Sequence, residues 1–340
     1  MSTYAEVGIH LDDSRQTTKR LEGLVARARG AGVLADVGAF GGMFRLGAAG
    51  AFRDPVLVAS VDGIGTKVKI AAVLGRYDGL GADIVNHCLN DIAVQGARPL
   101  FFLDYLALHR ADPQIVTTLV ASVAAACVEA GCSLLGGETA EMPDVYPPGE
   151  FDVAGFIIGV LDRSEIGANG VPSPGDVLLG LRSHGLHTNG YSLARRALPF
   201  DTWDAFDPEL GMTIGDALLV PHRSYLPEIQ ALIGAGACAF AHITGGAQPE
   251  NIARVIPEHL AAEIDTRAWE TPVIFQRIAS GASVSPDEMY RVFNMGIGLV
   301  AIVPGDRVDG AIEAVPEVIV IGQIVPRGDG EAVRLLGLDG

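Results

Sequence analysis

The chain has 340 residues, of which 49% are hydrophobic and 19% are charged. This length suits two domains of ordinary size, and the composition is typical of a globular protein rather than of a disordered chain. The formal net charge of −17 argues against a nucleic-acid partner held by a basic surface. No apolar run reaches the roughly 20 residues that span a bilayer, and the N-terminal segment lacks the pattern of a secretory signal. We therefore expect a cytoplasmic protein with no nucleic-acid or membrane partner.

The positions of the cysteines and lysines give further information about the compartment and the site. Cys88, Cys127, Cys132 and Cys238 stand at spacings that form no metal motif, so a reducing compartment would leave them as small buried side chains. Three of the 24 basic residues are lysines, and two of those, Lys67 and Lys69, share one loop. Since a compact ammonium suits phosphate sites, Lys67 is a candidate site residue, although coding bias would leave the same pattern.

The first half of the chain alternates short apolar runs with helical periods. The pattern predicts strands at 55–61, 100–108 and 151–161, helices at 79–95 and 113–130, and a further strand entering a Gly-Gly turn at 136–137. Gly, Pro and Asn crowd residues 167–176, where no apolar period can run, so we place a domain boundary there. The predicted domains are residues 1–168, which would bind ATP and dimerise, and residues 169–340, which would complete the active-site cleft.

The second half repeats this alternation. We expect strands at 177–181, 237–243, 297–303 and 317–324, a helix from about residue 191, a helix at 216–233 and one reaching residue 255. The fold class is therefore α/β (α+β).

Three polar segments interrupt these elements: DGIGTK at 62–67, GGETAEMP at 136–143 and SHGLHTNGYSLAR at 183–195. Carboxylate oxygens are the ligands that Mg²⁺ prefers when it is shared with a polyphosphate. Backbone amides of glycine approach phosphate oxygens closely because no Cβ intervenes. The acidic candidates are Asp62, Asp91, Glu138 and Glu141, and the glycine candidates are Gly63, Gly65, Gly136, Gly137, Gly245 and Gly246.

The standard nucleotide fingerprints are missing. No G-x-x-x-x-G-K-[ST] occurs, and no G-x-G-x-x-G follows a strand with an acid about twenty residues later. Each candidate also has a purely structural interpretation. Glu138 and Glu141 would form a solvated turn, His187 and His242 would be structural histidines, and Thr139 and Asn189 would cap helices.

Six motifs occur in one order: DGIGTK, NDIAVQGARPLFFLDYLA, GGETAEMP, HTNGYSLAR, HITGG with ENIARVIP, and MYRVFNMGIG. Together they resemble the phosphoribosylformylglycinamidine cyclo-ligases, also called aminoimidazole ribonucleotide synthetases, over roughly residues 38–323. The resemblance implies ATP-dependent closure of formylglycinamidine ribonucleotide to aminoimidazole ribonucleotide in purine biosynthesis. It also implies a homodimer, in which the mixed sheet of the N-terminal domain forms a barrel with that of its partner, and an α+β C-terminal domain.

The resemblance also implies roles for individual residues. Lys67, His187 and Asp91 are the catalytic candidates, and Mg²⁺ would be held by Asp62, Asn90, Asp91 and Glu141. His187, Thr188 and Asn189 would lie near substrate. ATP would contact Asp62, Gly63, Gly65, Thr66, Gly136, Gly137, Glu138, Thr139, Asn189, Gly245 and Gly246.

The chain departs from the family pattern at several places. Ala39 and Ala247 stand where glycines are usual, Glu22 stands where lysine is frequent, and DDSR follows Leu11. A divergent paralogue or a catalytically silent nucleotide-binding protein is therefore the alternative. Selenophosphate synthetase would need a reactive thiol in the N-terminal Gly-rich loop, where this chain has Phe40 and Met43, and the hydrogenase-maturation carbamoyl dehydratase would need a C-terminal cysteine. Thiamine monophosphate kinase lacks the pairing of GGETAEMP with HTNGYSLAR.

Overall fold

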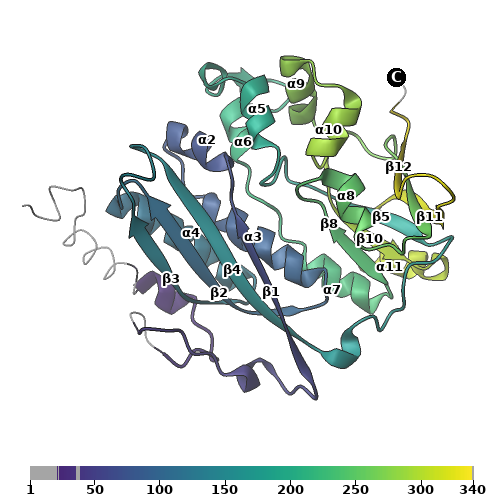
Figure 1. Cartoon of the computed structure of the whole chain (residues 1–340), viewed down its shortest axis with the longest axis horizontal. Helices are drawn as coiled ribbons and strands as arrows, with labels where there is room; N and C mark the ends of the chain where they lie inside the picture. Colours follow the sequence, from purple (N-terminus) through teal and green to yellow (C-terminus); the bar gives the residue numbers. More distant parts are fainter. Residues whose placement is uncertain (1–20, 22, 36–38, 339–340) are drawn as a thin grey trace, which may run out of the picture. The chain divides into compact units, whose positions relative to one another are not determined.

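The computed structural model describes residues 21, 23–35 and 39–338. The chain divides into two compact units, one formed by residues 1–92 and 97–163 and the other by residues 93–96 and 164–340 (Figure 1). The main division follows Arg163, whereas the sequence pattern places it after residue 168. Two departures from the family pattern, Glu22 and residues 12–15, lie outside the described residues.

The first unit is built on a four-stranded mixed sheet. Its strand order is β1-β4-β2-β3, in which β2 and β3 run parallel and the other neighbours run antiparallel. The strands are β1 (Pro55–Gly63), β2 (Arg98–Leu108), β3 (Ser133–Glu141) and β4 (Phe151–Asp162).

The helices that accompany this sheet include α2 (Lys67–Leu74), α3 (Leu80–Ala93) and α4 (Pro113–Glu129). Helix α4 begins where Asp112 caps the amides of Gln114 and Ile115 and where Pro113 occupies the first turn. Helices α3 and α4 lie on the same side of the sheet in Figure 1. Their apolar residues, such as Ile84 and Leu119, are fully buried.

The other face of this sheet is open along β1. Burial alternates strictly along the strand, so every second side chain points away from the helices. Leu57 is 61% exposed and Val61 58% exposed, and Phe156 on the neighbouring strand β4 is 39% exposed. An apolar stripe of this kind on a sheet face is typical of an interaction surface.

The second unit contains a six-stranded sheet of order β12-β9-β11-β5-β10-β8. Strands β12 and β9 are parallel, and the other neighbours are antiparallel. The strands are β5 (Val177–Arg182), β8 (Ala239–His242), β9 (Leu260–Asp265), β10 (Ile297–Val303), β11 (Ile319–Pro326) and β12 (Val333–Leu336). A separate small hairpin pairs β6 (Phe206–Asp207) with β7 (Met212–Thr213).

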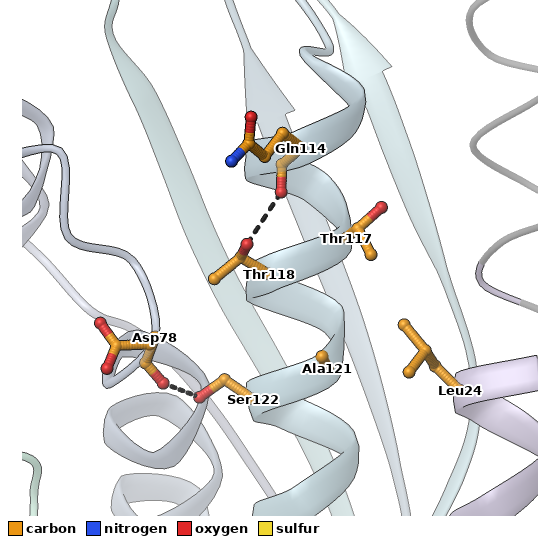
Figure 2. Close-up of a pocket in the computed structure, with 7 residues that line it drawn as sticks. All are labelled: Leu24, Asp78, Gln114, Thr117, Thr118, Ala121 and Ser122. Carbon is orange, nitrogen blue, oxygen red and sulfur yellow. Dashed lines mark hydrogen bonds between the residues drawn. The ribbon is translucent and has the colours of Figure 1, made fainter.

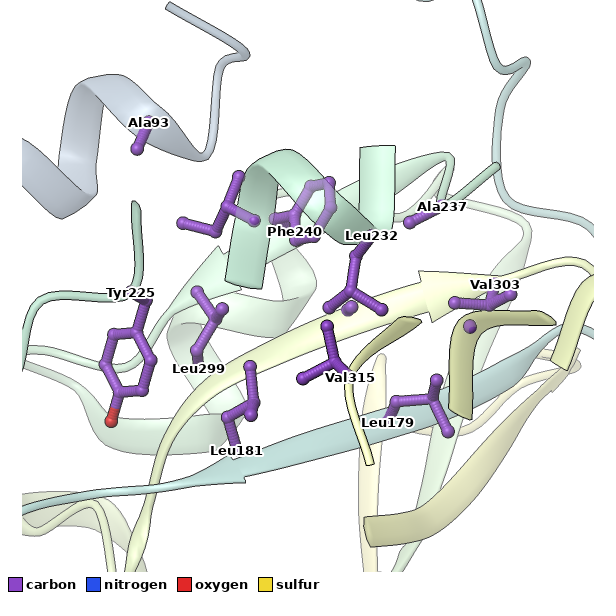
Figure 3. Packing of buried hydrophobic residues seen from close by; sticks show 13 residues of the cluster. Ala93, Leu179, Leu181, Tyr225, Leu232, Ala237, Phe240, Leu299, Val303 and Val315 are labelled. Atoms are coloured by element: carbon purple, nitrogen blue, oxygen red, sulfur yellow. The ribbon is translucent and has the colours of Figure 1, made fainter. Parts of the chain in front are cut away.

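Seven further α-helices belong to the described part of this unit: α5 (Tyr191–Ala197), α6 (Ile214–Leu219), α7 (Leu226–Gly234), α8 (Ala247–Ala253), α9 (Val273–Ala282), α10 (Pro286–Val292) and α11 (Val308–Ala314). Leu179 and Leu181 of β5 pack with Leu299 and Val303 of β10 in a core that α7 covers through Leu232 (Figure 3). The predicted α/β (α+β) class with a mixed N-terminal sheet is confirmed.

Two predictions of secondary structure are wrong. Gly136 and Gly137 lie inside strand β3 rather than in a turn, because their backbone pairs with β2 opposite Leu103 and Asp104. The single helix expected at 216–233 is two helices, α6 and α7. Pro221 lies between them, and a proline both lacks the helical N–H donor and disfavours helical backbone at the residue before it.

Candidate functional site

An acidic pair marks the end of β1 in the first unit. The hydroxyl of Ser60 lies 3.1 Å from Oδ2 of Asp62 and 3.1 Å from Oδ2 of Asp91. Ser60 and Asp62 share the helix-facing side of β1 because they are two residues apart on a strand. Asp91 comes from helix α3, which lies on that side, so two of the four predicted metal ligands meet around one hydroxyl.

Helix α3 presents a polar stripe at four-residue spacing, namely Asp83, His87 and Asp91. Nε2 of His87 lies 3.6 Å from Oδ1 of Asp62, so His87 adjoins the same carboxylate. The side chain of Asn90, next to Asp91, is fully buried. His87 and Ser60 were missed from the sequence, although the i, i+4 spacing of His87 and Asp91 and the i, i+2 spacing of Ser60 and Asp62 are signals that reveal both.

The carboxylates of Asp62 and Asp91 repel each other when both are ionised. Burial first, and then the neighbouring charge of Asp91, raise the pKa of Asp62 to about 6. A divalent cation would relieve that repulsion and would accept oxygen ligands from both carboxylates. The residues present therefore fit Mg²⁺, with Asp62 and Asp91 as its charged ligands.

The ammonium of Lys67 is a buried ion-pair partner. Its Nζ lies 2.8 Å from Oδ1 of Asp83, and both side chains are completely inaccessible to solvent. Burial lowers the pKa of Lys67, while the Asp83 carboxylate acts in the opposite direction. Lys67 therefore belongs to the buried interior of the first unit, and the pair ties the start of α2 to α3.

The rest of the DGIGTK segment is a tight turn. Gly63 is the last residue of β1, and Gly65 has a φ of 71°, which favours glycine. Thr66 is the residue before α2 and makes no capping hydrogen bond with its side chain. The exposed glycines leave backbone open to solvent at this turn.

The GGETAE segment lies elsewhere on the sheet. The strand register aligns Asp62 of β1 with Gly137 of β3 across the two strands between them. Glu141 lies four residues beyond Gly137 along β3. Since β1 and β3 are the two edge strands, Glu141 is roughly 14 Å from Asp62 across the sheet and roughly 13 Å along it. Oε1 of Glu141 accepts a hydrogen bond from the amide of Ala111 at 2.9 Å. One copy of the chain does not bring Glu141 to the acidic pair.

The other candidates of this segment line strand β3. Gly136 is half-buried, Glu138 is exposed and Thr139 is half-buried. Thr139 caps no helix, because it lies within the strand, so that alternative is wrong.

Asp104 on β2 is a buried acid that the sequence prediction missed. It is 8% exposed, and burial raises its pKa to about 7. A Cβ on Gly137 would lie 1.9 Å from Oδ1 of Asp104, so a glycine is required beside this carboxyl group. The signal was present, because a charged residue at the inward position of an alternating apolar strand is unusual.

Three loops converge in the second unit. Ser183 Oγ and the backbone oxygen of Gly185, in the loop after β5, both bond the side chain of Asn294, in the loop before β10. Gln248 of α8 donates to the Asn294 carbonyl at 3.2 Å. The segments SHGLHTNGYSLAR (183–195), HITGGAQ (242–248) and FNMGIG (293–298), well separated in sequence, therefore form one cluster.

Each loop of this cluster holds a non-glycine residue with positive φ. The values are 62° for His187, 50° for Ala247 and 51° for Met295. Such backbone is unfavourable for L-residues and gathers at ligand-binding sites. Ala247 occupies a position where glycine is usual in the cyclo-ligase family. The positive φ explains that preference, because glycine adopts such backbone without steric cost.

His187 is fully buried, and its Nε2 accepts a hydrogen bond from the amide of His184 at 3.1 Å. Asn189 donates to Oγ1 of Thr188 at 3.4 Å. A Cβ added to Gly245 would lie 3.4 Å from Oδ1 of Asn189, so these loops touch. Gly246 has a φ of 84° and precedes α8.

The hollows on the surface of the described residues include two of similar volume. One, of about 600 Å³, is lined by residues of α8, α10 and β12 and includes Gly246 among them. The other, of about 560 Å³, lies along α4 beside Leu24 and Asp78 (Figure 2). Its lining includes none of the predicted site residues. Among the described residues, no helix is both long enough and apolar enough to cross a membrane.

Solved structures share this fold at low sequence identity. Escherichia coli HypE matches with a TM-score of 0.69 and 18% identity, over 96% of this chain and 94% of that one. A hydrogenase maturation protein HypE in complex with ATP has a TM-score of 0.68 and 17% identity, covering 95% and 90%. Thiamine-monophosphate kinase from Stenotrophomonas maltophilia K279a has a TM-score of 0.62 and 18% identity, covering 92% and 94%.

Sequence models of one family match both halves of the chain. The AIR synthase related protein N-terminal domain matches residues 47–161, and the corresponding C-terminal domain matches residues 173–334. Apart from residues 93–96, each match falls within one compact unit, and the acidic pair lies within the first match. The chain therefore belongs to the AIR synthase related proteins.

Proposed function

We propose that this protein is an ATP-dependent cyclo-ligase that closes formylglycinamidine ribonucleotide to aminoimidazole ribonucleotide and releases ADP and phosphate. The observation that carries the proposal is the Ser60-bridged pair of Asp62 and Asp91 in the DGIGTK and NDI motifs. The six ordered motifs favour this member of the family over its other ATP-using members. De novo purine biosynthesis would be its setting, in the cytoplasm.

The reaction needs an activated carbonyl. An amide oxygen is a poor leaving group, so transfer of phosphate to the formyl oxygen lets a neighbouring nitrogen attack and phosphate depart. When bound, Mg²⁺ would neutralise phosphate charge during this transfer. Asp62 and Asp91 would hold the ion with Asn90 beside them, and the backbone of Gly63, Gly65 and Thr66 would approach the phosphates.

The clustered loops of the second unit would bind the phosphate-bearing ligands. His187, Asn189, Gly245 and Gly246 lie in them. Main-chain amides in such strained turns are suited to anions because they are oriented before the ligand arrives.

A homodimer is part of the proposal. Its support is the exposed apolar stripe of Leu57, Val61 and Phe156 on the open sheet face. The separation of Glu141 from Asp62 within one sheet is a second reason, because a partner sheet could supply what one copy does not bring together.

One observation favours the silent nucleotide-binding alternative. The ammonium of Lys67 is buried against Asp83, so the catalytic role expected from the sequence requires local opening of this pair. If the protein only binds ATP, Lys67 needs no such opening.

Ligand-induced melting separates the two candidates. A protein that binds ATP alone gains stability with Mg²⁺ and ATP by mass action and gains no more when formylglycinamidine ribonucleotide is added. The cyclo-ligase responds to the ribonucleotide as well and forms aminoimidazole product. Melting that is unmoved by either ligand contradicts both candidates.

A further inference from the structure

Two cysteines occupy the contact positions of the turn that ends helix α4. The Gly131 amide donates to the Val128 carbonyl at 3.1 Å, and the Cys132 amide donates to the Cys127 carbonyl at 2.8 Å. Gly131 has a φ of 65° and follows Ala130, whose backbone is helical. These bonds define a Schellman turn, in which side chains at the positions of Cys127 and Cys132 frequently contact each other.

The thiols of Cys127 and Cys132 meet in the interior of the first unit, where both side chains are buried. A hydrogen bond with the Cys132 thiol, followed by burial, raises the pKa of Cys127 well above its ordinary value. The backbone hydrogen bond, together with the covalent bonds on either side of it, keeps the two Cα atoms no more than about 7 Å apart. Only beyond that separation does bridging two cysteines require the backbone to move.

The same turn ends α3 and α7 with aliphatic side chains in place of the thiols. After α3, the amide of Ala97 donates to the carbonyl of Ile92 at 3.2 Å. After α7, the amide of Ala237 donates to the carbonyl of Leu232 at 2.9 Å. All four side chains are buried. An apolar contact is therefore enough to hold this turn, and the paired thiols at α4 call for a further role. Because cysteine also packs as a small apolar residue, packing alone is the alternative.

The turn gives an oxidant a route to the thiols. Val128 and Gly131 are exposed, so the end of α4 borders solvent, and helix ends open locally at low cost. Cys132 directly follows the exposed Gly131, whereas Cys127 is fully buried and has a raised pKa. Cys132 is therefore the thiol that reacts first when the turn opens, and Cys127 is the second.

We propose that Cys127 and Cys132 form a redox-modification site that hydrogen peroxide converts to a reversible disulfide. The Cys132 thiolate attacks a peroxide oxygen, and water leaves as the sulfur becomes a sulfenic acid. The Cys127 thiol then attacks that sulfur, and a second water leaves as the sulfur–sulfur bond forms. The two thiols lose two electrons and two protons in total, and the peroxide is reduced to water.

The disulfide makes covalent a contact that the fold already contains. It joins the last turn of α4 to the residue before β3, so it restrains both the unfolded chain and the local opening of this turn. The inference does not depend on the proposed reaction, because neither cysteine is among the residues assigned to ATP or Mg²⁺.

Peptide mass mapping of the folded wild-type protein tests the site. Reduced protein is treated with a small molar excess of hydrogen peroxide, and the remaining thiols are alkylated at intervals. Cleavage after Glu129, which lies between the two cysteines, should leave two peptides joined through Cys127 and Cys132 and released by dithiothreitol. Cys238 is half-buried in the second unit and is the internal comparison, because oxidation governed by exposure alone would modify it first.

Three outcomes of the mapping would overturn the proposal. The first is a pair that stays reduced while Cys238 is oxidised. The second is a disulfide from Cys88, another buried thiol of the first unit, in place of the proposed one. The third is sulfinic acid at Cys127 or Cys132 without any disulfide between them.

Cys132→Ala is the matched variant, because alanine occupies the equivalent position after α3 and α7. Oxidised wild-type protein should melt a few degrees above the reduced protein, since the bridge restrains the unfolded chain, and peroxide should not raise the melting temperature of Cys132→Ala. A wild-type protein that melts lower once bridged would contradict the proposal, because the turn would then be strained by the disulfide. The mapping itself needs no variant, so a Cys132→Ala protein that failed to fold would leave the decision intact.

Discussion

Asp62 is the residue on which the chemistry proposed for the first unit depends. Its carboxylate shares the Ser60 hydroxyl with Asp91 and lies 3.6 Å from a nitrogen of His87. Its raised pKa means that the ionised pair carries an electrostatic cost that a bound divalent cation would remove.

Replacing Asp62 with asparagine should therefore separate activity from stability. We expect turnover to fall about 100-fold or more, because one charged ligand of the cation is lost. The melting temperature without metal should stay level or rise at neutral pH, since the substitution removes repulsion with Asp91. Turnover and melting of Asp62→Asn are compared with those of Asp144→Asn, an exposed acid in the same unit. Near-native turnover would contradict the assignment.

The same pKa predicts how Mg²⁺ binding depends on pH. The pKa of Asp62 lies at about 6 in the unliganded fold, above its ordinary value of 3.8, so the unliganded native state gains relative stability as pH falls from 6 toward 4. A cation competes with that proton, so its Kd should rise below pH 6. Calorimetry at several pH values should show proton release on binding near pH 6, and a Kd that is constant from pH 5 to 8 would contradict this.

Lys67 should behave as a core residue. Lys67→Ala leaves Asp83 buried without its ammonium partner, and breaking a buried pair costs about 3–5 kcal/mol of unfolding free energy. The double variant Lys67→Met with Asp83→Leu should be more stable than either single loss. Lys69→Ala serves as the control, because Lys69 and its partner Glu150 are each 36% exposed and the cost should stay below about 1 kcal/mol. If denaturant unfolding shows that Lys67→Ala loses no more unfolding free energy than Lys69→Ala, the buried pair does not stabilise the fold as predicted.

At the scale of elements, the loops that meet in the second unit carry strained backbone. Ala247 has a φ of 50° and is completely buried at the start of α8. Ala247→Gly relieves the positive φ but removes one buried methyl group. We expect the free energy of unfolding to stay level or rise by up to about 1 kcal/mol.

Ala253→Gly in the same helix is the matched control. Ala253 has ordinary helical backbone, so its replacement should cost about 0.5–1 kcal/mol. Equal losses at the two positions, measured by denaturant unfolding, would show that the backbone of Ala247 stores no strain.

Element by element, the sequence predicts most of the first unit because its strands and helices have clear apolar periods. β1, α3, β2, α4 and β4 are found within a few residues of their expected positions. The pair Gly136 and Gly137 misled the prediction, because glycine favours turns locally, whereas Gly137 here avoids a clash with the Asp104 side chain of the neighbouring strand. That reason is tertiary, and no local pattern contains it.

The candidate site was predictable to the same extent. The sequence marked Asp62 and Asp91 as acidic candidates, and the structure brings them together. The burial of Lys67 and the distance of Glu141 from Asp62 depend on how elements far apart in sequence pack together. The family resemblance supplied residue roles but not these contacts.

At the scale of the whole molecule, the open face of the first sheet predicts an assembly. Val61→Asp should place a charge in the apolar stripe and shift a dimer toward monomer in sedimentation. Because Val61 is 58% exposed in one copy, the monomer itself should remain folded. Val73→Asp, at a 62% exposed site on α2, should leave the assembly unchanged. A wild-type protein that sediments as a monomer would contradict the proposed dimer.

The most direct test of the proposed reaction is the stoichiometry of one assay. Purified protein is mixed with Mg²⁺ and ATP, with and without formylglycinamidine ribonucleotide, and ADP and aminoimidazole ribonucleotide are measured in the same tube. The account predicts one aminoimidazole product for each ADP and little ADP without the ribonucleotide. ATP binding with no aminoimidazole product and no stimulation by the ribonucleotide would contradict it.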